Sequence, residues 1–352
     1  MTVRALSVRP LEAGSAELGE VPEPSSEEGS ILCDTVAVGV DGTDEEIVKG
    51  SYGEAPPGRA RLILGHESLG RVREAPPDSG FAPGDLLVGV VRRPDPVPCE
   101  NCARGQWDLC RNGRYTERGI KGRDGFLAER FRIEPEFAVR ADPALGRLAV
   151  LTEPASVVAK AWEHVDRLGS ARGYFEPLKA LVLGAGPLGL LGAMLGLQRG
   201  LDVHVLDLVE TGPKPDLAGK LGATYHAGTF DDLDVAFDVV LECTGVGPLA
   251  LHAIEHVAPG GVACLTGISR AGRTAPALDA DALNERIVLG NLVVFGSVNA
   301  ALRHYEQAQS ALAAVDRSWL ESLVTRWEPL DRWADALERR DGDVKTVIEF
   351  AA

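Results

Sequence analysis

Three separated stretches of the sequence carry side chains that can bind a divalent metal ion. They hold Asp41, the pair His66 and Glu67, and Glu153. Carboxylate oxygens and an imidazole nitrogen are ligands of Zn²⁺, and a bound zinc ion lowers the pKa of a substrate hydroxyl. Each stretch also has an ordinary alternative, in which Asp41 caps a helix, His66 is a hydrogen-bonded core histidine and Glu153 lies exposed.

A cluster of cysteines is a second candidate metal site. Three of the six cysteines, Cys99, Cys102 and Cys110, lie within twelve residues of one another. The first residues of the chain show no secretory signal, and in such a chain a cysteine cluster indicates metal binding before disulfides. The alternative is a metal-free lobe with three free thiols.

A glycine-rich motif indicates a nucleotide-binding loop. Residues Gly184–Gly189 follow an apolar run typical of a strand and begin a predicted helix. The first glycine permits a tight turn, the second lets the backbone approach a pyrophosphate, and the third lets helix and strand pack closely. A glycine-rich turn in another kind of α/β protein is the alternative. The expected cofactor contacts are Gly184, Gly186, Pro187, Leu188 and Gly189.

Asp207 ends the next predicted strand and bears on the choice of cofactor. It lies at the distance expected for a carboxylate that accepts hydrogen bonds from the adenosine ribose. An acid there repels the 2′-phosphate of NADP, and residues 207–210 contain no arginine or lysine. We therefore expect NAD to be preferred over NADP. Lys214 lies further along the loop and weakens this prediction without reversing it.

Two kinds of framework must position these side chains. The first third of the chain has β-branched, apolar runs bounded by Pro, Gly and Glu, at residues 3–8, 31–40 and 86–91. From about residue 178, short apolar strands alternate with helical segments, which predicts a doubly wound parallel sheet. The strands of this part are expected at residues 180–183, 201–206, 237–241, 262–266 and 292–295, and helices at 188–198 and 249–257. The end of the chain returns to helices and a final strand, residues 346–350.

Length and charge exclude several classes of protein. A chain of 352 residues predicts two domains, and its net charge of −16 disfavours binding to nucleic acid or to an anionic membrane surface. The uncharged run at residues 180–197 contains too many glycines for a good membrane-spanning helix. We expect a cytoplasmic protein.

Taken together, these motifs resemble those of the zinc-dependent medium-chain alcohol dehydrogenases, specifically their glucose 1-dehydrogenase branch. The motifs shared with the superfamily are Gly65–Glu67, Pro83–Asp85, the cysteine cluster, Gly184–Gly189 and Glu242–Gly245. Those that indicate the glucose branch are Tyr115–Ile120, Gly296–Asn299 and Val344–Ile348. The resemblance implies an α/β protein with a GroES-like β domain, residues 1–156 and 300–352, interrupted by a Rossmann domain, residues 157–299.

The resemblance also assigns roles around a catalytic zinc ion. Asp41 stands where most members have a cysteine ligand, His66 matches the histidine ligand, and Glu153 matches the remaining ligand. Glu67 matches a carboxylate that binds the zinc or supports its ligands. Thr43 matches the hydroxyl that passes the substrate proton outward, and Glu46 occupies a position where many members use a histidine.

Further implied contacts concern the structural zinc, the cofactor and the substrate. The three cysteines match the last three of a four-cysteine structural zinc lobe, whose first cysteine would fall at Pro96; Asp95 or a water would then be the fourth ligand. Thr244, Thr266 and Val298 are expected at the cofactor. Glu117 and Asn299, with Glu67 and Glu153, are expected at the substrate, although Glu117 has a surface ion pair with Arg118 or Arg114 as its alternative.

The function expected from this resemblance is oxidation of C1 of a glucose-like aldose to a lactone. A polyol, aminocyclitol or secondary-alcohol dehydrogenase of the same fold is the first alternative. A non-catalytic, nucleotide-binding redox sensor and a zinc-free quinone reductase are disfavoured, because neither needs Asp41, His66, Glu67 and Glu153. The resemblance further implies a homodimer or homotetramer that pairs strands near residues 292–295.

Overall fold

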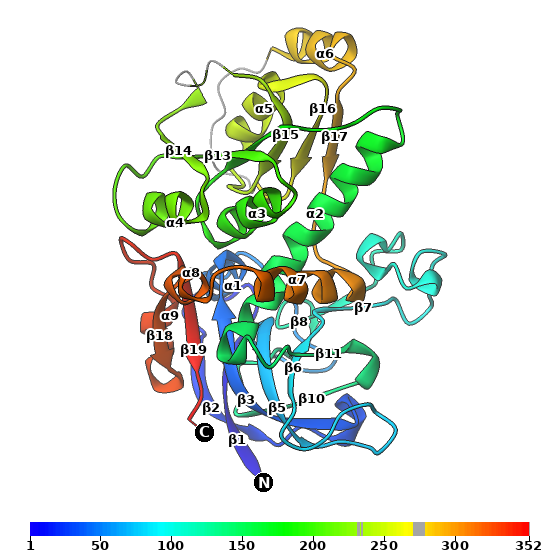
Figure 1. The fold of residues 1–352 in the computed structure, drawn as a ribbon. Coiled ribbons are helices and arrows are strands. Elements are labelled where there is room, and N and C mark those ends of the chain that lie inside the picture. The colour runs from blue at the N-terminus through cyan, green and yellow to red at the C-terminus, as the bar shows by residue number, and fades with distance from the viewer. Residues whose placement is uncertain (231–232, 234, 270–278, 352) are drawn as a thin grey trace. The chain divides into compact units, whose positions relative to one another are not determined.

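The computed structural model describes residues 1–230, 233, 235–269 and 279–351. The chain forms two compact units, of which the first combines Met1–Ser156 with Asn299–Ala352 and the second is Val157–Val298. The beginning and the end of the chain, blue and red in Figure 1, therefore belong to the same unit.

The first unit is built on a sheet of strand order β11-β6-β5-β3-β19-β18, with β10 also pairing with β3. Nearly all of β3 is buried, and its run of apolar and β-branched residues suits a central strand. The strands of this sheet are β3 (Ile31–Val40), β5 (Glu67–Glu74), β6 (Leu86–Gly89), β10 (Arg130–Ile133), β11 (Ala138–Arg140), β18 (Val324–Pro329) and β19 (Lys345–Glu349).

Two small sheets and several helices complete this unit. One small sheet consists of β1 (Thr2–Val8), β2 (Glu17–Pro22) and β4 (Leu62–Ile63), and the other of β7 (Arg92–Arg93), β8 (Thr116–Arg118) and β9 (Gly122–Arg123). The helices are α1 (Gly42–Val48), α7 (Leu302–Ala314), α8 (Arg317–Leu323) and α9 (Trp333–Leu337), and α2 (Thr152–Ser170) begins here and continues into the second unit.

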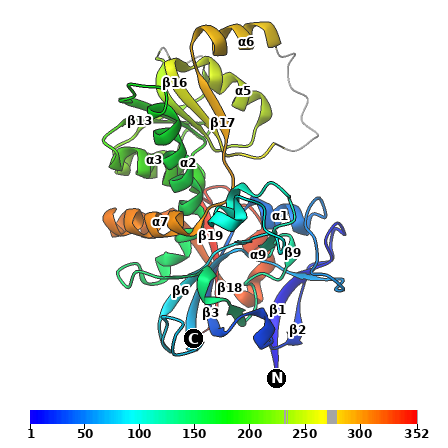
Figure 2. The ribbon, with the colours of Figure 1, turned by 90° about the vertical axis from the view of Figure 1, so that its right-hand side faces the viewer.

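Strand register brings distant parts of the sequence to one end of β3. Gly39 of β3 pairs with Glu67, the first residue of β5, and Val40 pairs with Thr346 near the start of β19. Figures 1 and 2 show the red β19 beside the blue β3. Residues just after β3, just before β5 and at the start of β19 therefore lie close together.

The second unit is a parallel sheet of order β14-β13-β12-β15-β16-β17. The described pairings are all parallel, which confirms the predicted doubly wound architecture. Its strands are β12 (Lys179–Leu183), β13 (Asp202–Asp207), β14 (Thr224–Ala227), β15 (Phe237–Glu242), β16 (Val257–Leu265) and β17 (Val293–Gly296). Its other helices are α3 (Pro187–Gln198), α4 (Pro213–Leu221), α5 (Gly247–Glu255) and α6 (Ala280–Leu289).

One boundary in this unit differs from the expectation. The helix predicted to reach Val257 ends at Glu255, and β16 already begins at Val257. The strand accommodates the Pro-Gly-Gly segment as an irregularity in register, with Gly260 at a φ of 79°. Among the described helices, none has the length and hydropathy needed to cross a membrane. The uncharged run that raised this question divides into β12 and α3.

Candidate metal and nucleotide sites

Asp41 uses its two carboxylate oxygens for different purposes. As the N-cap of α1, its Oδ1 accepts hydrogen bonds from the N–H groups of Thr43 at 2.7 Å and Asp44 at 3.3 Å. Its Oδ2 faces Nε2 of His66 at 3.5 Å and accepts from the Thr43 hydroxyl at 3.3 Å. The capping alternative is therefore realised by one oxygen, while the other remains directed at His66.

His66 lies between two carboxylates. Its Nδ1 is 3.7 Å from Oδ1 of Asp44, and neither atom has a hydrogen-bond partner in the described residues. Burial lowers the pKa of His66, but the charges of Asp41 and Asp44 outweigh it and raise this pKa well above its usual value. Asp44, which is completely buried, was not predicted; its position three residues after a helix cap is the signal that would have identified it.

Glu67 and Glu153 extend the cluster around His66. One potential ligand atom from each of Asp41, Asp44 and His66 lies within 4.8 Å of the others, and the same holds for His66, Glu67 and Glu153. Burial raises the pKa of Glu67, and it raises that of Glu153 to about 8. Glu153 is buried at the start of α2, so the exposed alternative for this residue is wrong.

Lys345 is an unpredicted member of the same cluster. Its Nζ forms an ion pair with Oε2 of Glu67 and donates to the carbonyl oxygen of Val40 at 3.0 Å. Both charged side chains are at most 2% exposed. Gly39 allows this arrangement, because a Cβ at that position would overlap Oε2 of Glu67. Four buried or half-buried carboxyl groups thus lie around one imidazole and one ammonium group, and their oxygen and nitrogen atoms are of the types that bind a divalent cation.

The two expected proton-handling residues lie on α1. Thr43 is half-buried, and its hydroxyl contacts the Asp41 carboxylate. Glu46 is also half-buried but is absent from both three-residue groups that include His66 in the described residues.

Glu117 and Asn299 are in direct contact. The Asn299 amide donates to Oε1 of Glu117 at 3.1 Å, and both side chains are buried. The same oxygen accepts from Arg92, at 3.1 Å from Nε and 2.9 Å from Nη2. The surface ion pair considered for Glu117 is wrong: Arg114 pairs with Asp95, and Arg118 lies near Glu134.

The thiol groups of Cys99, Cys102 and Cys110 lie within 4.8 Å of one another, and all six cysteines of the chain are free. Asp95 is outside this group. Its Oδ1 accepts from the Val97 N–H, and its Oδ2 accepts from Asn112 and Arg114. The carboxylate considered as a fourth ligand is therefore occupied by protein donors.

The nucleotide-type loop has the geometry that its glycines predict. Gly184 has a φ of 91°, and a Cβ at Gly189 would overlap the Gly184 carbonyl oxygen. Pro187 is the first residue of α3, and the preceding Gly186 offers no capping side chain. Leu188 occupies the second position of this helix. The first N–H groups of α3 therefore remain available to an anion.

Asp207 contacts this loop from the end of β13. It accepts hydrogen bonds from the Ala185 N–H at 2.7 Å and from Nζ of Lys214 at 2.9 Å. Burial raises the pKa of Asp207, but these two donors outweigh it and lower this pKa below its usual value. Lys214 therefore forms an ion pair with the carboxylate that is expected to determine the preference for NAD or NADP.

The other expected cofactor residues lie at or beyond the same ends of the parallel strands. Thr244 follows β15 and Thr266 follows β16, while Val298 follows β17 and is 47% exposed. Both threonines donate hydrogen bonds to the buried Glu242, a motif residue to which the sequence assigned no role: its Oε1 accepts from Thr244 and its carbonyl oxygen from Thr266. In doubly wound sheets this edge is where nucleotides bind.

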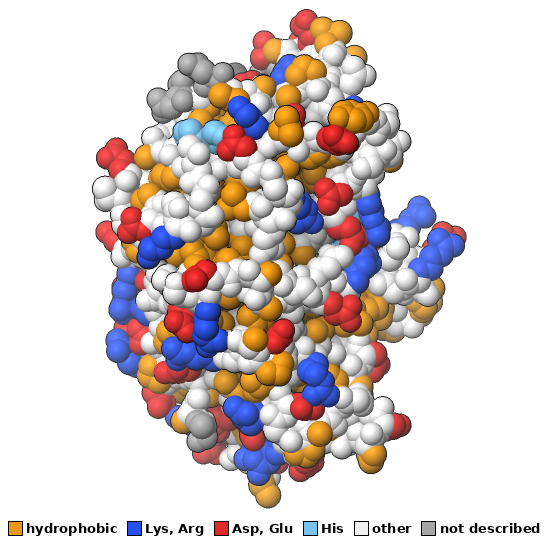
Figure 3. Space-filling model, viewed as in Figure 1, with side chains coloured by type: hydrophobic (Ala, Val, Ile, Leu, Met, Phe, Trp, Pro, Cys, Tyr) orange, Lys and Arg blue, Asp and Glu red, His pale blue; other side chains and the backbone are white. Residues whose placement is uncertain are grey.

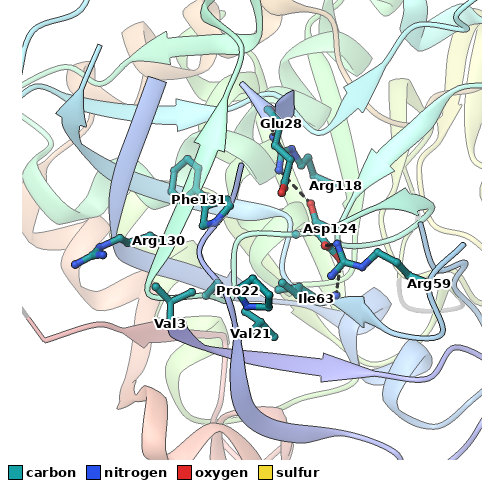
Figure 4. Close-up of a pocket in the computed structure, with 13 residues that line it drawn as sticks. Val3, Val21, Pro22, Glu28, Arg59, Ile63, Arg118, Asp124, Arg130 and Phe131 are labelled. Atoms are coloured by element: carbon teal, nitrogen blue, oxygen red, sulfur yellow. Dashed lines mark hydrogen bonds and ion pairs between the residues drawn. The ribbon is translucent and has the colours of Figure 1, made fainter. Parts of the chain in front are cut away.

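Two other features of the structure lie apart from the predicted site residues. The small pocket in Figure 4 contains none of the predicted site residues; in its lining Arg59 is paired to Asp124, and Arg118 donates to the Glu28 carbonyl oxygen. On the face drawn in Figure 3, acidic and basic side chains are interspersed. Neither feature competes with the clusters described above.

The fold and these clusters define the class of two-domain dehydrogenases with a GroES-like and a Rossmann-like unit. Residues 27–143 match the family described as alcohol dehydrogenase GroES-like domain, and residues 146–350 match the one described as glucose dehydrogenase C-terminus. The chain therefore belongs to the glucose dehydrogenase family of zinc-dependent medium-chain dehydrogenases, which confirms the predicted resemblance and fold class.

Individual relatives match almost the whole length of the chain. A glucose 1-dehydrogenase of Methanocella arvoryzae is 35% identical over 99% of this chain and 100% of the relative. One from Thermoproteus tenax is 38% identical, covering 99% of each chain. The solved structure of Haloferax mediterranei glucose dehydrogenase in complex with NADP, Zn and gluconolactone has a TM-score of 0.90 and 35% identity, with 99% of each chain covered.

Proposed function

We propose that this protein oxidises C1 of a glucose-like aldose to the lactone and transfers the hydride to a nicotinamide cofactor. The observation that carries the proposal is the presence, in one unit, of the buried cluster around His66 and of the buried Glu117–Asn299 pair. The names of the relatives and the sugar lactone in the Haloferax structure support the same substrate class.

Asp41, His66 and Glu153 are the residues proposed to hold a catalytic zinc ion, with Glu67 as a further ligand or a support for them. The fit rests on the carboxylate oxygens and imidazole nitrogen gathered there, and on Nδ1 of His66 and Oδ1 of Asp44, which have no hydrogen-bond partner in the described residues. When bound, zinc would supply Lewis acidity toward the substrate hydroxyl. A second zinc ion, held by Cys99, Cys102 and Cys110 with a fourth ligand other than Asp95, is proposed to be structural.

The chain's own residues bind the substrate and move its proton. We assign to Thr43 the transfer of the substrate proton away from the cluster, because its hydroxyl contacts Asp41 and its side chain is half-buried. Glu46, further along α1, is assigned as the second proton-handling residue. Glu117 and Asn299 would bind sugar hydroxyls. Buried polar groups of this kind disfavour simple alcohols, which leave them unpaired.

The first unit would bind metal and sugar and the second the cofactor. The domain bounds proposed from the sequence are residues 1–156 and 300–352 and residues 157–299, and they differ from the two compact units only at Asn299, which belongs to the first unit. We propose Gly184, Gly186, Pro187, Leu188, Gly189, Asp207, Thr244, Thr266 and Val298 as cofactor contacts. NAD is proposed as the preferred cofactor, because Asp207 lies where a 2′-phosphate would be repelled.

We also propose that the protein forms a homodimer or homotetramer through β17, since this strand is at the edge of its sheet and only partly buried.

The test is a panel of aldoses, polyols and simple alcohols assayed with NAD and NADP by absorbance of the reduced cofactor, together with zinc analysis. We expect activity with aldoses, a lactone product and loss of activity in exhaustively chelated protein. Oxidation of polyols or alcohols alone would contradict the aldose assignment, and full activity without metal would contradict the zinc site.

A further inference from the structure

The carboxylate of Glu117 is held from one side only. Arg92 and Glu117 are directly paired across β7 and β8, and both side chains are buried. Two nitrogens of Arg92 and the amide of Asn299 all donate to Oε1. The hydrogen bonds that Glu117 accepts in its side chain, within the described part of the chain, all go to Oε1 and none to Oε2. One oxygen is therefore saturated, and the other remains as an acceptor of fixed orientation.

Arg92 is itself held in place by the cysteine lobe. Its Nη1 donates to the carbonyl oxygen of Asp108 at 3.0 Å, and its guanidinium lies 3.8 Å from the centre of the Tyr115 ring. Asp108 belongs to the short 3-10 helix Trp107–Leu109, which ends where Cys110 begins. A single guanidinium thus connects the chain between the clustered cysteines to the carboxylate of Glu117.

Asn299 completes the arrangement in a conformation that needs support. Its φ of 62° is unusual for a residue other than glycine, and its Oδ1 accepts from the N–H of Ala300. The Asn299 amide donates to Oε1 of Glu117, the oxygen that Arg92 also contacts. Movement of the Arg92 guanidinium would therefore displace both Glu117 and Asn299, the two proposed substrate contacts.

We propose that Arg92 is a positioning residue for sugar binding, which fixes Glu117 with Oε2 toward the substrate and depends for its own position on the cysteine lobe. This inference rests on the proposed function, since it takes a polyhydroxylated substrate as the partner of Oε2. A charged, forked side chain is required, because an ammonium group cannot contact Oε1 and the Asp108 carbonyl in the same way.

The test compares Arg92→Gln and Arg92→Lys with the wild-type enzyme on an aldose and on an alcohol with one hydroxyl. We expect Arg92→Gln to raise the KM for the aldose about tenfold or more, the effect of losing one charge-assisted contact, with a smaller change in kcat. Arg92→Lys should recover part of this loss. The KM for the cofactor and the kcat/KM for the simple alcohol should change little.

Arg93→Gln is the matched control. Arg93 is the next residue and equally buried, but it pairs with Glu134. We expect this variant to lose stability without a rise in the KM for the aldose.

A second experiment uses Cys110→Ser to test the dependence on the cysteine lobe. This substitution should raise the KM for the aldose in the wild-type background and add little to the effect of Arg92→Gln, because substitutions at coupled sites are not additive.

The outcomes separate this inference from the proposed function. A wild-type enzyme without activity on any aldose would overturn both. An active wild-type enzyme whose aldose KM is unchanged in Arg92→Gln, or is raised equally for the simple alcohol or in Arg93→Gln, would overturn the role of Arg92 alone. If Arg92→Gln does not fold, the same comparison is decided with Arg92→Lys. Full additivity of Arg92→Gln and Cys110→Ser would refute the dependence on the cysteine lobe.

Discussion

The ammonium group of Lys345 lies against Oε2 of Glu67, and the strands that carry the two residues both flank β3. Neither charge has appreciable contact with water, so each depends on the other for its ionised form. The Val40 carbonyl oxygen accepts a further hydrogen bond from Lys345, which connects the pair to β3, the strand that ends immediately before Asp41. Through Lys345, the last strand of the chain therefore stabilises the ionised carboxylate of Glu67 in the proposed metal site.

Lys345→Met should strongly destabilise the metal-free protein. Removing one partner of a buried pair leaves the other uncompensated, at a cost of about 3 kcal/mol or more, which urea unfolding would measure. The double variant Lys345→Met with Glu67→Gln should recover much of this loss because no charge is then left unpaired. A single variant within about 1 kcal/mol of wild type would argue that Glu67 is neutral in the folded protein.

Gly39→Ala should impair metal binding. Its Cβ would overlap the Glu67 carboxylate and push it from its position, so zinc content and stability should both fall, the latter by about 1–3 kcal/mol. Gly19→Ala is the control, since Gly19 also lies in a strand but a Cβ there meets no atom within 4 Å. Equal zinc retention in the two variants would show that Glu67 is free to move.

Local patterns in the sequence were sufficient to predict part of this architecture and not the rest. The loop Gly184–Gly189 and the doubly wound sheet follow from short-range spacing. Lys345 and Arg92 could not be predicted as site residues, because their partners are set by strand register across long stretches of chain. Glu242 begins one of the motifs shared with the superfamily, but its role could not be assigned, because nothing local in an apolar strand indicates that the side chain accepts hydrogen bonds from the turn that follows.

Asp41→Cys should have opposite effects in the two metal states. Thiolate is the softer ligand and should slow zinc loss to a chelator. Without metal, the variant should be less stable by about 1 kcal/mol, because Oδ1 no longer caps α1. Asp41→Asn is the matched control, which retains the cap and weakens the metal site. Zinc loss that is unchanged or faster in Asp41→Cys would place residue 41 outside the metal's ligands.

Cys99 should be the most reactive thiol of the chelated protein. Hydrogen bonds from the N–H groups of Arg111 and Cys102 lower the pKa of Cys99 to about 6, whereas burial raises that of Cys102 to about 11. Alkylation of Cys99 should therefore rise with pH through about 6 and be nearly complete at neutral pH, with Cys102 unmodified. Mass spectrometry of the labelled peptides measures this, and added zinc should protect Cys99. Equal labelling with and without zinc would favour a metal-free lobe.

Cofactor preference tests the contact between Asp207 and Lys214. NADP would place a phosphate where Asp207 stands, so repulsion and the loss of a charge-assisted bond should favour NAD by about 2–4 kcal/mol, roughly thirty- to a thousandfold in kcat/KM. Lys214 reduces this preference if it turns from Asp207 to the phosphate, and Lys214→Ala should then widen the ratio of NAD to NADP efficiency. Asp207→Gly with Leu208→Arg should narrow or reverse it. If the unmodified enzyme used NAD and NADP with equal kcat/KM, and Lys214→Ala then preferred NAD, the attraction of Lys214 for the phosphate would outweigh the repulsion from Asp207, the carboxylate that Lys214 contacts.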